Sequence, residues 1–239
     1  MKKILSVTLA LFFLTNAFSQ EKTDWSKVVI DRAGDHFLMA FSYDNWTGVP
    51  DSIRDRMSGF PRGFNIALMI SKPFQSDPRW SVAFGLGISH SSIFFEKTKI
   101  DLISRTIQLP FKNLDTLEHF KKYKLATTFA EIPIELRYTS NPLNQKKAWK
   151  LALGVKVGTM LDTHTKGKNL QDKNNNNIND YTEKIKKRSY FNSTRLAATA
   201  RAGIGNFSVY YSYSITSYMK DVAGPPVHPY QIGLCLSGL

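Results

Sequence analysis

The stretch LAATARAGIGNFSVYYSYSIT, residues Leu196–Thr216, decides the fold of this chain. On one parity every residue is apolar or aromatic, whereas the other parity carries Arg201 among hydroxyl-bearing and small residues. A period of two places these two sets on opposite faces of a β-strand. Gly205-Asn206 lies between the two runs and suits a two-residue hairpin turn, because both residues tolerate positive φ. We therefore expect two antiparallel strands that share one wholly apolar face.

The rest of the chain repeats this alternation, so that eight strands are expected in all. They are Phe37–Asp44, Gly63–Ser71, Trp80–Ser89, Ala130–Tyr138, Trp149–Leu161, the two halves of Phe191–Thr216, and Pro229–Ser237. Long connections follow the odd-numbered strands and short ones follow the even-numbered strands; the third long one, Asp162–Tyr190, is polar and is expected to be a loop. A soluble sheet has no reason to show this asymmetry, whereas an outer-membrane barrel has short periplasmic turns and long external loops. We predict an all-β fold, an eight-stranded antiparallel up-and-down transmembrane β-barrel.

The charged residues within the expected strands support this prediction. They lie on the parity that would face the barrel interior, where opposite charges can pair, and they would be costly on the lipid-facing side. The predicted interior ion-pair residues are Glu131, Glu135, Arg137, Lys150, Lys156, Arg195 and Arg201. If the fourth turn pairs Tyr138 with Trp149, Glu131 lies directly opposite Lys156.

Aromatic residues cluster at both ends of the expected strands, as in the two girdles of a membrane barrel. At the short-turn ends they are Trp80, Tyr138, Trp149, Phe207 and Tyr230. At the long-loop ends they are Trp46, Phe94, Phe95, Phe191 and Tyr218.

The first residues read as a secretory signal peptide. Two lysines precede an apolar run from Ile4 to Phe18, and small residues lie at the expected cleavage site after Ser19. We expect residues 1–19 to be the signal peptide, 20–36 a periplasmic lead-in and 37–239 the outer-membrane barrel. The formal charge of +13 falls to +11 without Lys2 and Lys3. In an exported chain this charge favours outer-membrane lipids and lipopolysaccharide phosphates as neighbours, and nucleic acid is not expected.

Most of the expected barrel resembles the PorT-like outer-membrane β-barrel proteins of Gram-negative bacteria. The resemblance rests on AGDHFLMAFSYDNWTGVPDSI, FPRGFNIALMISKPF, SVAFGLGISHSSIFF, EIPIELRY, LGVKVGTML and PYQIGLCLSGL, between Gly34 and Leu239. These stretches are structural rather than catalytic. The resemblance implies a small barrel with a structural or interaction role through its extracellular loops, in some members linked to protein secretion or gliding machinery.

One segment of the third long connection, DKNNNNINDYTE, has the spacing of a calcium loop. Oxygen-bearing side chains fall at positions one, three, five, nine and twelve, and position seven would supply a backbone carbonyl. The residues are Asp172, Asn174, Asn176, Ile178, Asp180 and Glu183. With three carboxylates the affinity would be weak, about 10⁻⁴–10⁻³ M. The alternative is a solvated Asn-rich loop whose spacing arises by chance. No other cofactor is expected, and the single cysteine, Cys235, excludes a disulfide framework within the chain.

A second small cluster raises an enzymatic alternative. His90-Ser91-Ser92 with Glu96 could act as base and nucleophile in an outer-membrane lipid-modifying hydrolase, but polar residues at a strand end explain the same pattern. We therefore expect a non-enzymatic outer-membrane protein that binds lipids and envelope protein partners. Eight strands leave an interior filled by side chains, which disfavours a wide pore.

Overall fold

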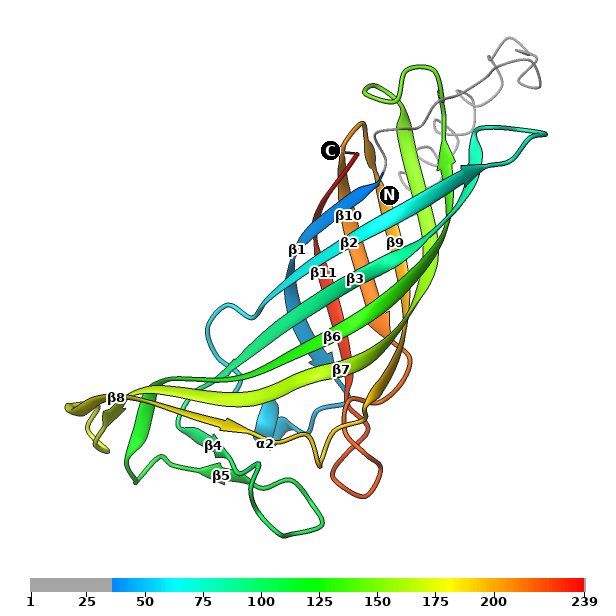
Figure 1. Ribbon diagram of the computed structural model, residues 1–239. Coiled ribbons are helices and arrows are strands. Elements are labelled where there is room, and N and C mark those ends of the chain that lie inside the picture. Colours follow the sequence, from blue (N-terminus) through cyan, green and yellow to red (C-terminus); the bar gives the residue numbers. More distant parts are fainter. Residues whose placement is uncertain (1–35, 239) are drawn as a thin grey trace, which may run out of the picture.

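The computed structural model describes residues 36–238; the predicted signal peptide and nearly all of the lead-in lie outside this range. Eight strands form a closed antiparallel barrel, in the order β6-β3-β2-β1-β11-β10-β9-β7, and β6 pairs with β7 to close the ring (Figure 1). The elements are β1 (Phe37–Thr47), α2 (Asp51–Arg54), β2 (Arg62–Pro73), β3 (Trp80–Phe95), β4 (Thr98–Ile100), β5 (Phe111–Asn113), β6 (His119–Thr139), β7 (Trp149–Gln171), β8 (Asn177–Lys186), β9 (Thr194–Ile204), β10 (Phe207–Ser214) and β11 (His228–Ser237). The predicted fold is confirmed.

The polarity of the barrel wall is the reverse of that of a soluble barrel. In β10 the exposed residues are Phe207, Val209 and Tyr211, and the buried ones between them include Ser208 and Ser212. Apolar side chains that point outward would be costly in water and are satisfied by lipid tails. Among residues 36–238, no helix is long and apolar enough to cross a membrane.

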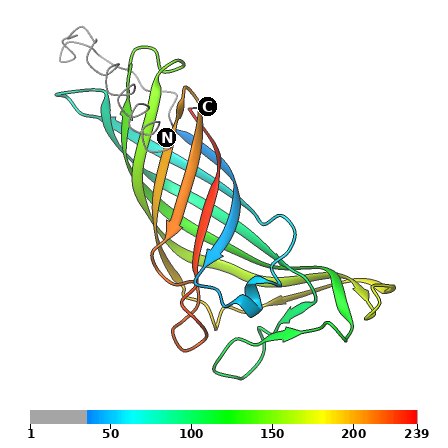
Figure 2. The same cartoon turned by 180° about the vertical axis from the view of Figure 1, so that it is seen from behind.

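The connections alternate in length as predicted. The short turns, with the start of β1 and the end of β11, lie at one end of the barrel, and the long connections gather at the other (Figures 1 and 2). By the usual asymmetry of bacterial barrels, the short-turn end is periplasmic and the long-loop end is external. Four of the aromatic residues predicted at the short-turn end lie there: Trp149 is 60% exposed and Phe207 is 69% exposed, and the rings of Trp80 and Tyr138 lie 5.0 Å apart. The prediction is wrong for Tyr230, which pairs with Asn45 and Tyr213 at the long-loop end because β11 begins there.

The prediction that Asp162–Tyr190 is a loop is wrong. β7 continues to Gln171, far beyond the apolar band, and β8 pairs back against it through register positions such as Gly167 with Glu183. We call this hairpin, residues 164–186, the wing; Figure 1 shows it projecting sideways from the long-loop end. Nearly all of β8 is exposed. Because most of β8 faces water, its sequence carries no regular alternation of apolar and polar residues, whereas Leu170 and Ile185 pack against the buried hydrophobic cluster of the long-loop end.

Candidate functional site

Two groups of paired charges occupy the barrel interior. The Glu131 carboxylate lies 3.1 Å from Lys156 Nζ and also accepts a hydrogen bond from Arg195. One layer nearer the short-turn end, the Glu135 carboxylate accepts hydrogen bonds at 2.8 Å from Arg137 Nε and at 2.7 Å from Arg201 Nη2. All six side chains are buried. Each glutamate therefore faces two cations: one comes from the same or the neighbouring strand, and the other, Arg195 or Arg201, comes from β9 on the far side of β7.

The predicted register between β6 and β7 is wrong by two residues. Glu131 lies opposite Gly158, and Lys156 lies opposite Pro133, because Tyr138 pairs with Leu151 rather than with Trp149. The ion pair forms nonetheless, since diagonal neighbours on one face of a sheet remain within reach of long side chains.

Two glycines of β7 make room for the glutamates. A Cβ atom on Gly154 would lie 2.9 Å from Glu135 Cγ, and one on Gly158 would lie 3.0 Å from Glu131 Cγ. These small inward residues thus mark where the long charged side chains of β6 and β9 meet over the inner face of β7. Lys150, the remaining predicted interior residue, is half-buried at the short-turn end, close to Arg137 and Arg201.

A hydrophobic core fills the external half of the barrel and continues into the long connections; we call it the cap. Its members come from strand ends and loops alike: Trp46, Val49, Ile93, Phe95, Ile100, Leu102, Leu109, Phe120, Tyr123, Leu125, Phe129, Met160, Tyr190, Phe191, Tyr218, Met219, Ala223 and Val227. The predicted external girdle is wrong for Trp46, Phe95, Phe191 and Tyr218, which are at most 8% exposed. These rings point inward at the barrel mouth, where they pack on one another; Phe191 and Tyr218 lie 4.8 Å apart.

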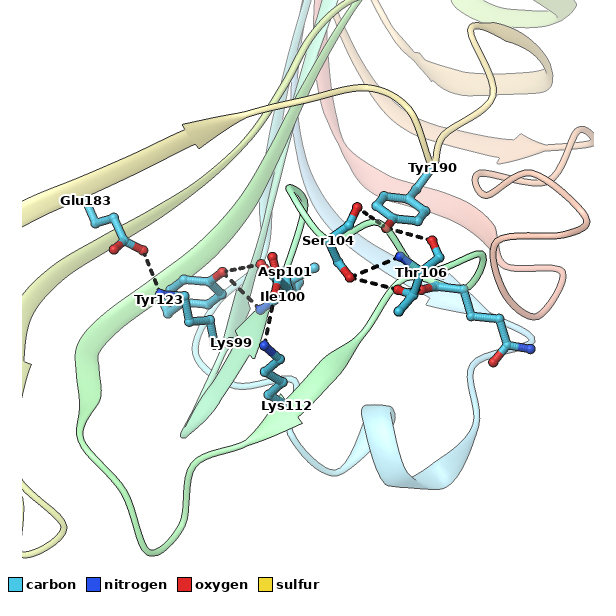
Figure 3. A network of polar contacts seen from close by, with 10 residues as sticks. Lys99, Ile100, Asp101, Ser104, Thr106, Lys112, Tyr123, Glu183 and Tyr190 are labelled. Carbon is cyan, nitrogen blue, oxygen red and sulfur yellow. Dashed lines mark hydrogen bonds and ion pairs between the residues drawn. The ribbon is translucent and has the colours of Figure 1, made fainter.

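Polar contacts fix the cap to the barrel wall (Figure 3). The Tyr123 hydroxyl of β6 accepts a hydrogen bond from Ile100 N at 3.0 Å and donates one to Ile100 O at 3.1 Å. The Tyr190 hydroxyl lies 2.8 Å from Ser104 O and 3.0 Å from Thr106 O. The hydroxyls of Tyr123 and Tyr190 therefore both anchor the backbone of the β3–β6 connection, which orders the external surface.

The charge layer and the cap together close the lumen. Between them lies a cavity of about 20 Å³, lined by residues that include Asp44, Arg195 and Tyr218. That volume accommodates about one water molecule. Within residues 36–238 the arrangement is that of a plugged barrel rather than an open channel.

Comparison with known proteins agrees with this architecture. Residues 18–220 match the family model described as outer membrane protein beta-barrel domain. The chain belongs to this family. As an outer-membrane β-barrel protein it resides in the outer membrane and is surrounded by lipid.

Solved structures similar to this outer-membrane barrel include Ail, the attachment invasion locus protein of Yersinia pestis. One is its complex with the heparin analogue sucrose octasulfate, at 12% identity and a TM-score of 0.36. Another, of Ail itself, has 15% identity and a TM-score of 0.29; each alignment covers 84% of this chain and 96% of Ail. No curated protein matches the sequence.

The predicted calcium-loop residues lie in the wing, in a conformation that separates its ends. Asp172 Oδ1 accepts hydrogen bonds from the backbone N–H groups of Asn174 and Asn176, both at 2.8 Å, which closes the tip of the hairpin. These backbone hydrogen bonds hold the pKa of Asp172 below its usual value. Glu183 lies opposite Gly167, about 13 Å along the strand from the tip at about 3.3 Å per residue.

The other predicted ligands follow the hairpin rather than one common centre. Asn176 ends the tip, Ile178 and Asp180 lie along β8, and Glu183 forms an ion pair with Lys99 at 3.2 Å. Among residues 36–238, no group of three or more His, Cys, Asp or Glu side chains is placed to hold a metal ion. Calcium binding stays a prediction and requires the hairpin to rearrange.

The structure brings together His90 and Ser92 but not the acid of the hydrolase alternative. His90 Nε2 lies 3.1 Å from Ser92 Oγ, and His90 Nδ1 lies 3.0 Å from Thr128 Oγ1. In the described part of the chain, no carboxylate is among the hydrogen-bond partners of His90. The backbone N–H of Glu96 donates a hydrogen bond to Arg56 O. Ser92 is 2% exposed and accepts a hydrogen bond from Lys124.

One surface was missed by the reasoning from sequence, namely a basic patch on the outer wall just above the lipid-facing band. We call it the basic strip: Arg62, Lys122, Lys124, Lys166 and Lys168. The sequence contains an indication of this patch in two pairs of lysines at positions i and i+2, Lys122/Lys124 and Lys166/Lys168. These pairs lie in segments that were expected to be loops, so their common face was not apparent.

Proposed function

We propose that this barrel is a surface interaction protein that binds an envelope protein partner through its cap and wing. The observation that carries the proposal is the free edge of β8. Among residues 36–238, this ten-residue strand pairs with β7 alone and stands last in the strand order of the sheet. An exposed edge presents unpaired N–H and C=O groups, to which an extended segment of a partner adds as a further strand.

The composition of β8 supports strand addition at its outer half. Residues 177–182, NINDYT, contain Asp180 as the one charged residue, whereas the lysines that discourage edge pairing lie nearer the barrel, at Lys184 and Lys186. The outer half also offers exposed Ile178 and Tyr181 side chains for specificity.

Two contacts anchor the wing to the rest of the long-loop end. The rings of Tyr181 and Phe120 meet edge to face at 5.6 Å, and Lys99 bridges to Glu183 across from the β4–β5 sheet. A strand that is already extended loses little conformational freedom on binding, which favours affinity. A plugged lumen leaves these outward surfaces as the parts that meet other molecules.

We further propose that the chain is a PorT-like barrel, and that its partner belongs to a secretion or gliding apparatus. Two features support this proposal. The stretches between Gly34 and Leu239 resemble that family, and the long-loop end carries the exposed edge of β8. Binding rather than catalysis accords with a His90–Ser92 pair that has no acid partner among the described residues.

The test uses a photo-cross-linking amino acid at Asn179 on the β8 edge, with Gln145 on the short-turn side as the matched control. In a second variant, Asn-Gly replaces residues 169–181, which joins the paired residues Lys168 and Thr182 by a two-residue hairpin turn. We expect one partner adduct from Asn179, none from Gln145, and loss of that partner from co-purification with the shortened wing. Undiminished recovery of the partner by the shortened variant refutes the proposal.

A further inference from the structure

The basic strip lies on the outward face of four adjacent strands, β2, β3, β6 and β7. Lys124 of β6 is in register with Phe94 of β3 on one side and with Lys166 of β7 on the other. One step outward, Lys122 is in register with Lys168. These residues share the parity of the lipid-facing residues of β6, such as Ile132, so their side chains project from the outer wall and not into the lumen.

The cations of the strip gather around the Phe94 ring. Arg62 and Lys124 both lie over the Phe94 ring, at 5.4 Å and 5.9 Å from its centroid. In the described part of the chain no carboxylate lines the depression of about 280 Å³ that the strip forms. Of the nearby acids, Asp162 pairs with His164 and Lys186, and Glu183 pairs with Lys99. Glu96 lines an adjoining hollow rather than this depression. Such a site attracts an anion.

An apolar groove of about 690 Å³ begins where the strip ends. Aromatic side chains line it, with Phe41 and Phe64 at 5.0 Å and Tyr43 and Phe60 at 5.5 Å between ring centroids. Leu234, 67% exposed, continues it into the lipid-facing band. Arg62 and Lys124 line both the groove and the depression, so the two features are continuous.

We propose that this surface binds a phosphorylated glycolipid of the outer leaflet, with a phosphate on Arg62 and Lys124 and an acyl chain in the groove. The apolar groove lies on the membrane side of the cations. This arrangement favours a lipid, whose acyl chain lies deeper than its phosphate, over a soluble anion. The position at the long-loop end selects the outer leaflet, whose phosphorylated lipid is the lipid A part of lipopolysaccharide. The inference rests on the membrane orientation of the barrel and is independent of the partner of the wing.

The site also gives a role to polar residues at the head of the groove. Ser92 Oγ accepts a hydrogen bond from Lys124 Nζ at 3.1 Å, and His90 holds the same oxygen from the other side at 3.1 Å. These contacts fix the Lys124 ammonium at the junction between groove and strip. His90 and Ser92 thereby act as positioning residues for the phosphate-binding cation.

The test uses the full-length barrel in nanodiscs of neutral phosphatidylcholine, titrated with bisphosphorylated lipid A and with the same lipid after removal of its phosphates. The variant is Arg62→Gln/Lys124→Gln. The matched control, Lys173→Gln/Lys220→Gln, removes the same charge from exposed positions elsewhere on the long-loop side. Heat-modified migration on gels verifies that each variant is folded.

We expect the intact barrel to prefer the phosphorylated lipid and the strip variant to lose about thirtyfold in affinity, at roughly fivefold for each cation near a membrane surface. The control keeps its affinity within about twofold, since exposed charges more than about 8 Å away are screened at physiological salt. Equal loss in the control, or equal binding of the dephosphorylated lipid by the intact barrel, overturns the proposal. Equally tight binding of inorganic phosphate alone overturns the assignment of the groove to an acyl chain.

Discussion

Removal of the Glu131 carboxylate tests whether the buried charges stabilise the barrel as a group. Glu131 meets two cations, Lys156 at 3.1 Å and Arg195, and all three side chains are at most 9% exposed. Glu131→Gln keeps the shape of the side chain and leaves two buried cations facing each other. Breaking a buried pair by removing one partner costs about 3–5 kcal/mol. The folding equilibrium then shifts by roughly two to three and a half powers of ten.

Lys156→Met gives the contrasting result. Glu131 keeps Arg195 as its partner, so the substitution removes one cation and leaves a neutral pair. The Tyr210 hydroxyl, which accepts a hydrogen bond from Lys156 at 2.9 Å, loses that donor, at a cost of about 1 kcal/mol. The double variant leaves a single unpaired cation, Arg195, and is expected between the two single variants in stability.

The assay is reversible urea unfolding of the barrel in lipid vesicles, followed by tryptophan fluorescence and by gel migration without heating. The expected order of stability is the intact barrel, Lys156→Met, the double variant, and Glu131→Gln. If Glu131→Gln is no less stable than Lys156→Met, the three side chains do not act as a charge-compensated group, and the reasoning from burial and pairing is refuted.

Three further predictions concern the long-loop side. A cysteine at Asn175 is labelled on intact cells by a membrane-impermeant reagent and one at Gln145 is not, because the two turns lie on opposite sides of the membrane; equal labelling contradicts the orientation. Calcium titration of the purified barrel gives heat in the millimolar range that Asp172→Ala abolishes; no heat up to about 10 mM leaves the hairpin as a simple turn. The hydrogen bond from Arg56 lowers the pKa of Asp115 to about 2, so its stabilising contribution is present above about pH 4 and is lost as the pH falls toward 2. Hydrogen exchange in the β3–β6 connection therefore rises over that interval, and Asp115→Asn removes the dependence.

The sequence by itself determined the polarity of the wall. Alternation is a local property of one strand, so the run around Gly205-Asn206 sufficed to predict an apolar outer face and a polar inner face. The lengths of the connections added the membrane topology, and the inward parity of Glu131 and Glu135 followed from the same alternation. Each of these features depends on residues near one another in the chain.

Only the tertiary structure decided which groups meet. Strand order and register determine which side chains lie within reach on the inner face. Glu131 therefore pairs with Arg195 of β9 as well as with Lys156, and the predicted register fails by two residues. The wing was not predicted because its outer strand, β8, is mostly exposed and shows no regular alternation of apolar and polar residues. Trp46 lies on the inward parity of β1, so the alternation itself indicates the cap side, whereas Phe191 lies outside the strands, where no alternation fixes its direction. The basic strip exists only once β6 and β7 extend beyond the membrane and align Lys124 with Lys166, since no local pattern couples segments so far apart in the chain.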